Sequence, residues 1–339
     1  MKKLLVIAPN SVHTLNFLEF VKNLFDEIIL CSEQEVESKV PDRQYQVNFK
    51  TINPLTLLSQ RKALKKIIVN EAPDLVHVHQ VTRHAFAAVP LVKSLKRPVI
   101  LSAWGSDVLV VPDQSFLYKW LVSRTLKKAD VVVCDSQEMM LKIESLGRGE
   151  NNEMVLFGIE PIEEHTKSKI VYSNRLHEKL YNIDVIIRLF ANFSKDNPDW
   201  KLRIAGSGGQ TAQLTTLVET LGVKNSVQFI GWLSKEENRK EYQNAAVYIS
   251  IPDSDGTAVS LLEAMSAGCI PVVPDLPVSK EWITDGENGI VHNGNQNPLA
   301  RSVELNSELV KGINKKIIEE KGTQDVTRVH YQRIYKSLI

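Results

Sequence analysis

The chain has 339 residues, with 41 Lys and Arg against 40 Asp and Glu, and 43% of its residues are hydrophobic. This composition excludes an intrinsically disordered chain, and the length favours two domains. The formal net charge of +1, spread evenly over both halves, excludes the basic excess expected of a nucleic-acid-binding protein.

Short apolar segments alternate with longer segments of helical periodicity from the N-terminus onward. In the first half we expect strands at 4–8, 27–31, 75–78, 99–102, 131–134 and 155–157, and helices at 14–25, 57–69, 116–128 and 138–146. The pattern then begins again, with strands at 170–172, 202–205, 227–230, 247–251, 270–273 and 289–291 and helices at 180–193, 213–220, 235–244 and 259–267. This alternation predicts βαβ units around parallel sheets.

The repeated pattern predicts an α/β protein with two Rossmann-like domains facing across a cleft. The polar stretch 160–169 contains a proline and has no periodicity, which is typical of a domain boundary. We therefore predict an N-terminal domain at 1–163, a C-terminal domain at 164–322 and a separate amphipathic helix at 323–339.

The cysteines and the N-terminus indicate the compartment. Cys31, Cys134 and Cys269 lie far apart within apolar runs, which fits neither a disulfide framework nor a zinc site. The first apolar run ends at Pro9, too early for a signal peptide, and no run is long enough to span a membrane. We expect a cytoplasmic protein with buried thiols.

One segment after the strand at 247–251 is the most informative for function. A helix that starts near Thr257 presents unpaired backbone N–H groups and the positive end of its dipole, which predicts an anion site. Glu263 lies two turns further on, where its carboxylate could accept hydrogen bonds from hydroxyl groups. An ordinary capped helix is the alternative. The residues of this candidate site are Asp255, Gly256, Thr257, Ala258, Val259, Ser260 and Glu263.

Two cations and a glycine-rich loop follow other strands of the second half. Arg175 and Lys179 come directly after its first strand, where a bidentate guanidinium and a mobile ammonium could neutralise a diphosphate. Gly206 follows the second strand, and glycines there let a ligand approach the backbone. For the basic pair, a solvated surface is the alternative.

In this order and at these intervals, the three loops resemble the donor-binding half of the retaining GT-B glycosyltransferases of family 4. These enzymes transfer sugars from nucleotide sugars. The resemblance is carried by the Asp255-x7-Glu263 element within Leu-Leu-Glu-Ala-Met, by Ile-Pro-Val-Val before Asp275, and by the Arg-x3-Lys pair. It covers about 165–295 well and the first half only in outline.

The resemblance implies a role for each donor-side residue. Glu263 is implied to hold the ribose hydroxyls, Arg175 and Lys179 to grip the diphosphate, and 257–260 to contact the distal phosphate. Breaking the sugar–diphosphate bond develops negative charge, which places Arg175 and Lys179 in the catalytic machinery.

The base is implied to lie against the segment 229–232, with Ile230 and Gly231 beside it. The helix at 323–339 is implied to cross back and brace the first domain. Both segments lie outside the phosphate loops of the second half.

The sequence departs from the family at two positions that bear on chemistry. Asp255 stands where the family has Glu, which changes its implied contact to the donor sugar. Trp104 stands where many members have His and cannot accept a proton, so Asp107 or another group must take that role. Trp104 is either a wall of the cleft or a platform for a sugar, and His13 is either structural or close to the acceptor.

The resemblance implies a metal-independent, retaining, hexosyltransferase-like enzyme that uses a UDP- or GDP-sugar. The acceptor is implied to be a glycan or a lipid-linked molecule in cell-surface polysaccharide or glycoconjugate biosynthesis. No cofactor is expected, because the nucleotide sugar is a substrate. Asp253-Ser254-Asp255 also matches a metal motif, and His77 and His79 could suggest a metal, but we expect none. The alternatives are a nucleotide-sugar epimerase or phosphorylase and a non-catalytic sugar-nucleotide-binding subunit.

Two stretches of the first half, 61–66 and 117–128, are basic and amphipathic. Such faces contact anionic membranes, here the inner leaflet that would hold a lipid-linked acceptor, and simple solvation is the alternative. The expected partners are therefore the nucleotide sugar, the acceptor and, weakly, an anionic membrane surface, with no nucleic acid.

Overall fold

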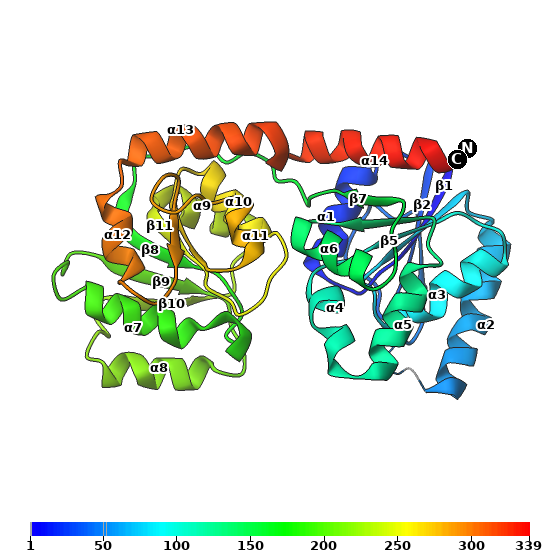
Figure 1. Ribbon diagram of the computed structural model, residues 1–339, viewed down its shortest axis with the longest axis horizontal. Helices are drawn as coiled ribbons and strands as arrows, with labels where there is room; N and C mark the ends of the chain where they lie inside the picture. The colour runs from blue at the N-terminus through cyan, green and yellow to red at the C-terminus, as the bar shows by residue number, and fades with distance from the viewer. Residues whose placement is uncertain (1, 50, 52) are drawn as a thin grey trace. The chain divides into compact units, whose positions relative to one another are not determined.

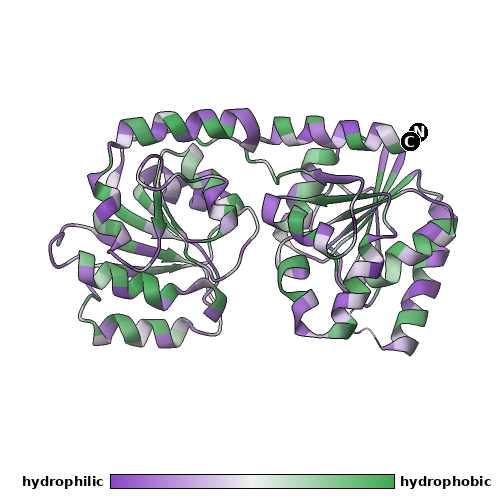
Figure 2. Ribbon diagram, viewed as in Figure 1, coloured by the Kyte–Doolittle hydropathy of each residue, from purple (hydrophilic) through white to green (hydrophobic). Residues whose placement is uncertain are grey.

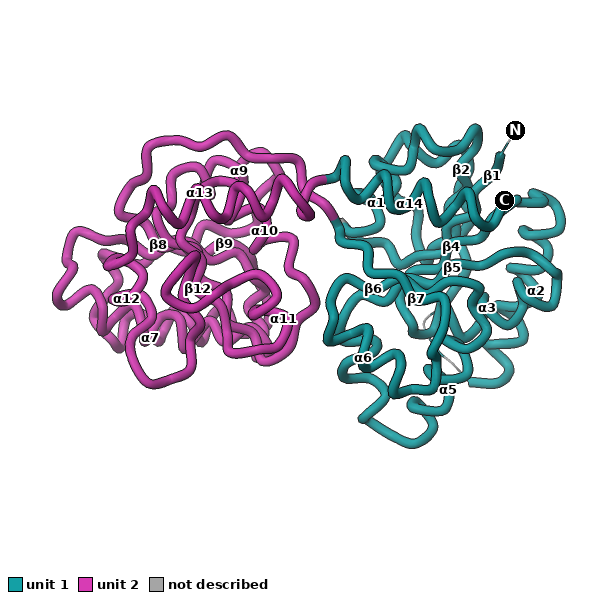
Figure 3. The backbone as a smooth tube through the Cα atoms, turned by 45° about the horizontal axis from the view of Figure 1, so that its top comes forward, with its two compact units in different colours: residues 1–157, 324–339 teal, residues 158–323 magenta. Residues whose placement is uncertain are grey.

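The computed structural model describes residues 2–49, 51 and 53–339. The chain forms two compact units, Met1–Phe157 with Gln324–Ile339 as unit 1 and Gly158–Thr323 as unit 2 (Figure 3). Each unit has its own parallel sheet covered by helices (Figure 1). No helix in the described part of the chain is both long and apolar enough to cross a bilayer.

Unit 1 has, within its described residues, a seven-stranded parallel sheet in the order β3-β2-β1-β4-β5-β6-β7. Its strands are β1 (Lys3–Ile7), β2 (Glu27–Ser32), β3 (Arg43–Gln46), β4 (Leu75–His79), β5 (Val99–Ser102), β6 (Val131–Cys134) and β7 (Asn152–Met154). Its helices are α1 (Val12–Val21), α2 (Pro54–Glu71), α3 (Arg83–Ser94), α4 (Ser106–Leu109), η1 (Val111–Gln114), α5 (Phe116–Leu126), α6 (Gln137–Ser145) and α14 (Gln324–Leu338).

The strands of unit 1 bury side chains on both faces, which explains their nearly continuous apolar sequences. Leu5 and Ile7 point to a core shared with α2, α3, α5 and α6. Leu4 and Val6 point to the opposite core, which contains α1 and the side chains that α14 contributes. Figure 2 shows the same alternation as green strands between helices with one purple face.

Unit 2, in which every residue is described, has a six-stranded parallel sheet in the order β10-β9-β8-β11-β12-β13. Its strands are β8 (Ser168–Ser173), β9 (Lys201–Ala205), β10 (Val227–Gly231), β11 (Ala245–Ile249), β12 (Ile270–Pro274) and β13 (Ile290–His292). Its helices are η2 (Lys179–Tyr181), α7 (Ile183–Phe193), α8 (Thr211–Thr220), α9 (Lys235–Asn244), α10 (Val259–Ser266), α11 (Pro277–Lys280), α12 (Pro298–Glu304), α13 (Ser307–Ile317) and the π-helical turn η3 (Ile318–Gly322).

The first domain boundary lies six residues earlier than the predicted 163/164. The polar stretch after Phe157 is part of unit 2, because Ile162 is buried there and donates its backbone N–H to Ser266 Oγ at 2.9 Å. Ile159 also pairs with Thr323 in a parallel bridge. Residues 324–339 pack within unit 1, where the hydroxyl of Tyr335 lies 3.1 Å from Nδ1 of His77.

Candidate functional site

The candidate site lies at the carboxyl edge of the unit 2 sheet. Strand β8 pairs with β9 on one side and with β11 on the other, so the chain direction of the crossovers reverses beside β8. Such a switch point is where parallel α/β sheets bind ligands. The loops after β8, β9 and β11 carry Arg175, Gly206 and Asp255 respectively, and all three therefore meet at this edge.

Arg175 is held in place by contacts with three side chains. Its Nη2 lies 2.8 Å from Oδ2 of Asp255, and its Nη1 donates to Ser260 Oγ at 3.4 Å. The guanidinium carbon lies 4.5 Å from the centre of the Tyr181 ring. Burial lowers the pKa of Arg175, but Asp255 and the nearby Tyr248 outweigh it and raise that pKa above the usual value. The guanidinium is thus held charged and oriented by three side chains.

Asp255 has an ion-pair partner in the structure, whereas Lys179 has none among the described residues. The carboxylate of Asp255 binds Arg175, a pairing that the sequence did not indicate, and its contact to a donor sugar stays a prediction. Lys179 begins the short helix η2 and is exposed, and it forms no ion pair with any described residue. One cation of the predicted pair is therefore held by partners, and the other is exposed and has no ion-pair partner among the described residues.

The first turn of α10 provides the unpaired N–H groups, and it begins at Val259, as the predicted helix 259–267 does, rather than near Thr257. The backbone N–H groups of Ala258, Val259 and Ser260 make no hydrogen bond to any described residue. They lie at the positive end of the helix dipole, which is a favourable environment for a phosphate.

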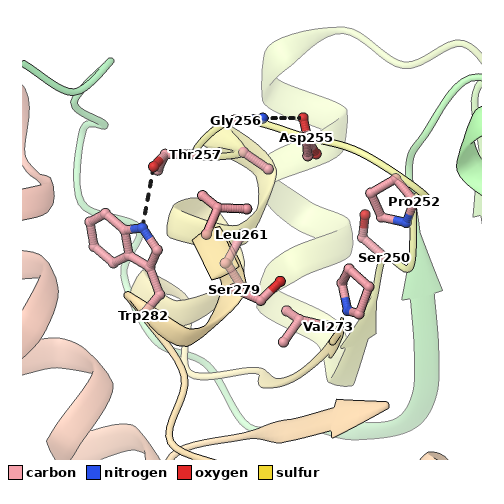
Figure 4. A pocket seen from close by; sticks show the side chains of 12 residues that line it. Ser250, Pro252, Asp255, Gly256, Thr257, Leu261, Val273, Ser279 and Trp282 are labelled. Carbon is pink, nitrogen blue, oxygen red and sulfur yellow. Dashed lines mark hydrogen bonds between the residues drawn. The ribbon is translucent and has the colours of Figure 1, made fainter. Parts of the chain in front are cut away.

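Thr257 lies just before α10, and its contact to a phosphate stays a prediction. It is buried, and its Oγ1 accepts a hydrogen bond of 3.3 Å from Nε1 of Trp282 (Figure 4). Gly256 donates its N–H to Asp255 Oδ1 at 3.1 Å in the same loop (Figure 4). The pocket drawn in Figure 4 has a volume of about 20 Å³, enough for about one water molecule and too small for a nucleotide. Thr257 lines this small pocket, and its hydrogen bond with Trp282 holds the loop in place.

The loop after β9 requires a glycine at position 206, where it contacts the loop that carries Arg175. Gly206 has a φ of +100°, and a Cβ there would lie 2.6 Å from the carbonyl oxygen of Arg175. Its N–H donates to the carbonyl of Gly231 at 2.7 Å, which joins the ends of β9 and β10. Gly231 is exposed and Ile230 beside it is half-buried, so both are available to a ligand at this edge.

Beneath these loops lies a network of buried tyrosines that the sequence analysis missed. The hydroxyl of Tyr242 donates to the half-buried carboxylate of Glu263 and accepts a hydrogen bond of 2.7 Å from Asn174 Nδ2. The hydroxyl of Tyr248 donates to Asn174 Oδ1 at 3.0 Å. Asn174 immediately precedes Arg175, so the network connects Glu263 to the arginine loop. The tyrosines read as ordinary core residues in the sequence, because only the fold brings their hydroxyls together.

Burial raises the pKa of Glu263, and the hydrogen bond from Tyr242 offsets that rise only in part. Its carboxylate is therefore easier to protonate than an exposed glutamate. A group of this kind is suited to accept hydrogen bonds from hydroxyl groups of a ligand when it is ionised.

In unit 1, Asp107 is one candidate for the role that Trp104 cannot fill, and that role stays a prediction. It is buried, and its Oδ2 accepts hydrogen bonds from the N–H groups of Val81 at 2.7 Å and Trp104 at 3.2 Å. Burial raises the pKa of Asp107, and these backbone bonds lower it in part. Asp107 thus ties the loop after β4 to the loop after β5, which makes it a positioning residue.

His13 and Trp104 lie together at the carboxyl edge of the unit 1 sheet. Their ring centres are 5.4 Å apart, and the ring of Phe157 lies 5.6 Å from His13. His13 is exposed and Trp104 is half-buried. Nε1 of Trp104 is buried and has no hydrogen-bond partner among the described residues. These aromatic groups form one face of unit 1 that could contact a sugar ring.

The two carboxylates and His77, which had suggested a metal, have other hydrogen-bond or ion-pair partners. Asp253 accepts a hydrogen bond from Asn182 Nδ2 at 2.6 Å, whereas Asp255 binds Arg175. His77 hydrogen-bonds Ser102 at 2.7 Å on the buried face of β4. Across the described residues, no group of three or more His, Cys, Asp or Glu side chains is arranged to hold a metal ion.

Comparisons with known proteins concern the family and the fold of the chain. The family model described as glycosyl transferases group 1 matches residues 159–321, and the model described as glycosyl transferase 4-like matches residues 2–136. The two models thus match most of unit 2 and most of unit 1.

Two curated relatives are similar over part of the chain. An exopolysaccharide phosphotransferase of Streptomyces coelicolor is 34% identical over 137 residues, which are 40% of this chain and 14% of that protein. The alpha-monoglucosyldiacylglycerol synthase of Streptococcus pneumoniae is 23% identical over 252 residues, 65% of this chain and 56% of that protein. The chain therefore spans less than two thirds of the length of either relative.

Among solved structures, Anabaena HepE in complex with UDP and glucose superposes with a TM-score of 0.83. The sequence identity is 14%, and the superposition covers 99% of this chain and all of that one. This similarity shows the fold, which is two parallel-sheet α/β domains.

Proposed function

The chain belongs to the GT4-type glycosyltransferases, which have the GT-B fold, and from this premise we propose that it transfers a sugar from a nucleoside-diphosphate sugar with retention of configuration. The donor is a UDP- or GDP-sugar, and the acceptor is a glycan or a lipid-linked molecule of cell-surface polysaccharide or glycoconjugate synthesis. The UDP and glucose bound by HepE support UDP as the first nucleotide to test. The names of the two curated relatives support this acceptor class.

The observation that carries the proposal is the set of positive groups around the carboxyl end of β8. Arg175 is held charged, Lys179 is exposed, and the N–H groups of 258–260 are unpaired within the described chain. Cleavage of the sugar–diphosphate bond builds negative charge on the leaving oxygen and positive charge on the sugar. Preorganised donors at the diphosphate therefore lower the barrier more than any other feature of the site.

Retention follows if the acceptor attacks on the face from which the diphosphate leaves. We propose that the leaving phosphate takes the acceptor proton, because Asp107 is buried and bonded to backbone N–H groups. The loops of unit 1 that carry His13 and Trp104 would hold the acceptor. This division leaves the phosphate chemistry to unit 2.

We further propose that no metal is needed. The carboxylates of Asp253 and Asp255 have separate protein partners, Asn182 and Arg175, rather than a shared site for one ion. The diphosphate charge is met by Arg175, Lys179 and the start of α10.

The experiment that tests the function begins with a panel of UDP- and GDP-sugars in thermal unfolding. The cognate donor should raise the midpoint progressively as its concentration increases. Incubation of that donor with glycan and polyprenyl-diphosphate acceptors should then give a product whose anomeric configuration, measured by NMR, equals that of the donor. EDTA should leave the rate unchanged. Conversion of the donor without acceptor would indicate an epimerase or phosphorylase, and binding without turnover over the whole acceptor panel would indicate a non-catalytic subunit.

A further inference from the structure

A surface of exposed apolar and basic side chains begins at the first turns of two helices of unit 1 and continues along them. Leu55 on α2 and Phe116 on α5 are 81% and 86% exposed, the highest values among the large hydrophobic residues described. Trp120, one turn after Phe116, is 46% exposed. We call this set the α2–α5 surface, and it consists of Leu55, Leu58, Lys62, Lys65, Lys66, Phe116, Leu117, Lys119, Trp120 and Arg124.

The fold brings the two helices to one side and aligns their first turns. Leu64 of α2 and Val122 of α5 belong to the same core on one face of the sheet. Helix α3 lies against both, and Arg61 of α2 donates to the carbonyl of Phe86 in α3 at 3.1 Å (Figure 1). Each helix follows a parallel strand and runs back antiparallel to it, so both first turns lie at the carboxyl edge of the sheet.

The charge of the same two segments has one sign. Residues 54–70 and 115–129 contain eight Lys and Arg and no Asp or Glu, in a chain whose net charge is +1. In the described structure, Lys62, Lys65 and Lys119 take part in no ion pair, so their charges are available to a partner. Arg124 lies over the ring of Trp120, with its guanidinium carbon 5.0 Å from the ring centre.

The exposed apolar and basic side chains of the α2–α5 surface together indicate what kind of partner it binds. Aromatic and leucine side chains enter the boundary between lipid headgroups and acyl chains, while Lys and Arg beside them attract anionic headgroups. A second copy of the chain would bring two unpaired basic surfaces together, which is electrostatically unfavourable. We propose that the α2–α5 surface docks this protein onto an anionic lipid bilayer. The bilayer would then face the edge of the sheet that carries His13 and Trp104.

The test is flotation of the full chain with lipid vesicles, without donor or acceptor, so its result is independent of the proposed transfer reaction. The wild type should float with phosphatidylcholine–phosphatidylglycerol vesicles and not with pure phosphatidylcholine, and salt should weaken binding. Phe116→Ser combined with Trp120→Ser, and separately Lys62→Glu combined with Lys65→Glu, should each reduce binding by about tenfold or more.

Two exposed positions of unit 2 provide matched controls. Leu309→Ser, at a side chain that is 58% exposed, and Lys316→Glu should bind vesicles like the wild type. Circular dichroism and the unfolding midpoint show whether each variant is folded. The proposal is overturned if the wild type ignores anionic vesicles, if it binds neutral ones equally well, or if folded α2–α5 variants bind like the controls. A concentration-dependent dimer that Phe116→Ser abolishes, without vesicle binding, would assign the surface to a second copy instead.

Discussion

Arg175 shows how a single residue is prepared for its role before a ligand arrives. Its guanidinium is bound by Asp255, touches Ser260 and stacks on Tyr181, so little side-chain freedom remains to be lost when a diphosphate binds. The position of Arg175 after a strand could be predicted from the sequence. Its partners could not, because Asp255 and Ser260 are about 80 residues away and only the sheet order brings them to the same edge.

Gly206 gives a test at the same scale. Gly206→Ala places a Cβ 2.6 Å from the carbonyl oxygen of Arg175, so the arginine loop must move and donor affinity should fall about tenfold or more. Isothermal titration with the donor nucleotide measures this. The control is Gly222→Ala, which also has a positive φ but has no atom within 4 Å of the new Cβ. Equal affinities for the two variants would contradict the proposed contact between the loops.

Glu263 should give donor binding a dependence on pH. Its pKa is raised, so as pH falls the carboxylate is protonated earlier than an exposed glutamate, whose pKa is about 4.3. If the ionised form accepts hydrogen bonds from the donor, affinity should fall on acidification. Tyr242→Phe removes a hydrogen bond to the charged form, so the loss should move to higher pH. Titrations from neutral to acidic pH measure both effects.

The control for this prediction is Glu263→Gln, which should bind weakly and without the acidic transition. If Glu263→Gln and the wild type lose affinity over the same pH range, another group is responsible. If Tyr242→Phe moves the loss of donor affinity to lower pH, the hydrogen bond from Tyr242 does not lower the pKa of Glu263.

At the scale of elements, the apolar strands were predicted closely because both their faces are buried. Strand β6 spans the predicted 131–134, and β5 the predicted 99–102. Strand β3 was missed because its sequence Arg-Gln-Tyr-Gln lies at an edge and has no apolar run. The strand expected at 155–157 is instead the polar β7 just before it, since pairing with β6 rather than hydrophobicity decides that edge.

The prediction of helices from the sequence was also incomplete. Helix α3 was missed because it is buried over most of its surface, so its apolar residues give no clear 3.6-residue period, and Pro90 lies inside it. Helix α10 begins at Val259, as the predicted helix 259–267 does, whereas the interpretation of the anion site placed the helix start near Thr257, two residues early. For a site built on a helix start, that difference decides which N–H groups face a ligand.

Strand β4 should make unit 1 sensitive to acid. His79 is fully buried, neither ring nitrogen has a hydrogen-bond partner among the described residues, and burial, with the nearby His13 and His84, lowers its pKa to about 3. The unfolded chain binds a proton at a pKa of about 6.5, so stability is present above that pH and falls as the pH drops towards 3. Between pH 7 and pH 5 this one group should cost about 2 kcal/mol.

Chemical unfolding at the two pH values measures the effect. His79→Leu should lose less free energy of unfolding on acidification than the wild type, whereas His330→Leu, at an exposed histidine of α14, should behave like the wild type. If His79→Leu keeps the full pH dependence, the buried neutral histidine is not its source. His77, whose pKa burial also lowers, then becomes the group to replace.

For the whole molecule, a net charge of +1 conceals a local organisation. Two α/β units, their parallel sheets and the fold class could be predicted, because alternation of apolar and periodic segments extends over the entire chain. The observed boundary differs from the predicted one, since the polar stretch before Ser168 packs on unit 2 through Ile159 and Ile162, which are too few to give the stretch an apolar period. Arg175 and Lys179, the proposed phosphate ligands, follow one strand of unit 2, and basic side chains without ion-pair partners among the described residues lie at one side of unit 1.

We expect Arg175 to stabilise the leaving diphosphate, and the rate of sugar transfer by Arg175→Ala measures this contribution. One such donor typically contributes roughly 10²- to 10³-fold, so kcat should fall by that factor while the variant remains folded. Arg175→Lys, which keeps the charge but loses the planar fork, should fall in between. Arg188→Ala, at an exposed arginine of α7, should retain the wild-type rate. A folded Arg175→Ala variant that transfers sugar as fast as Arg188→Ala would contradict the account.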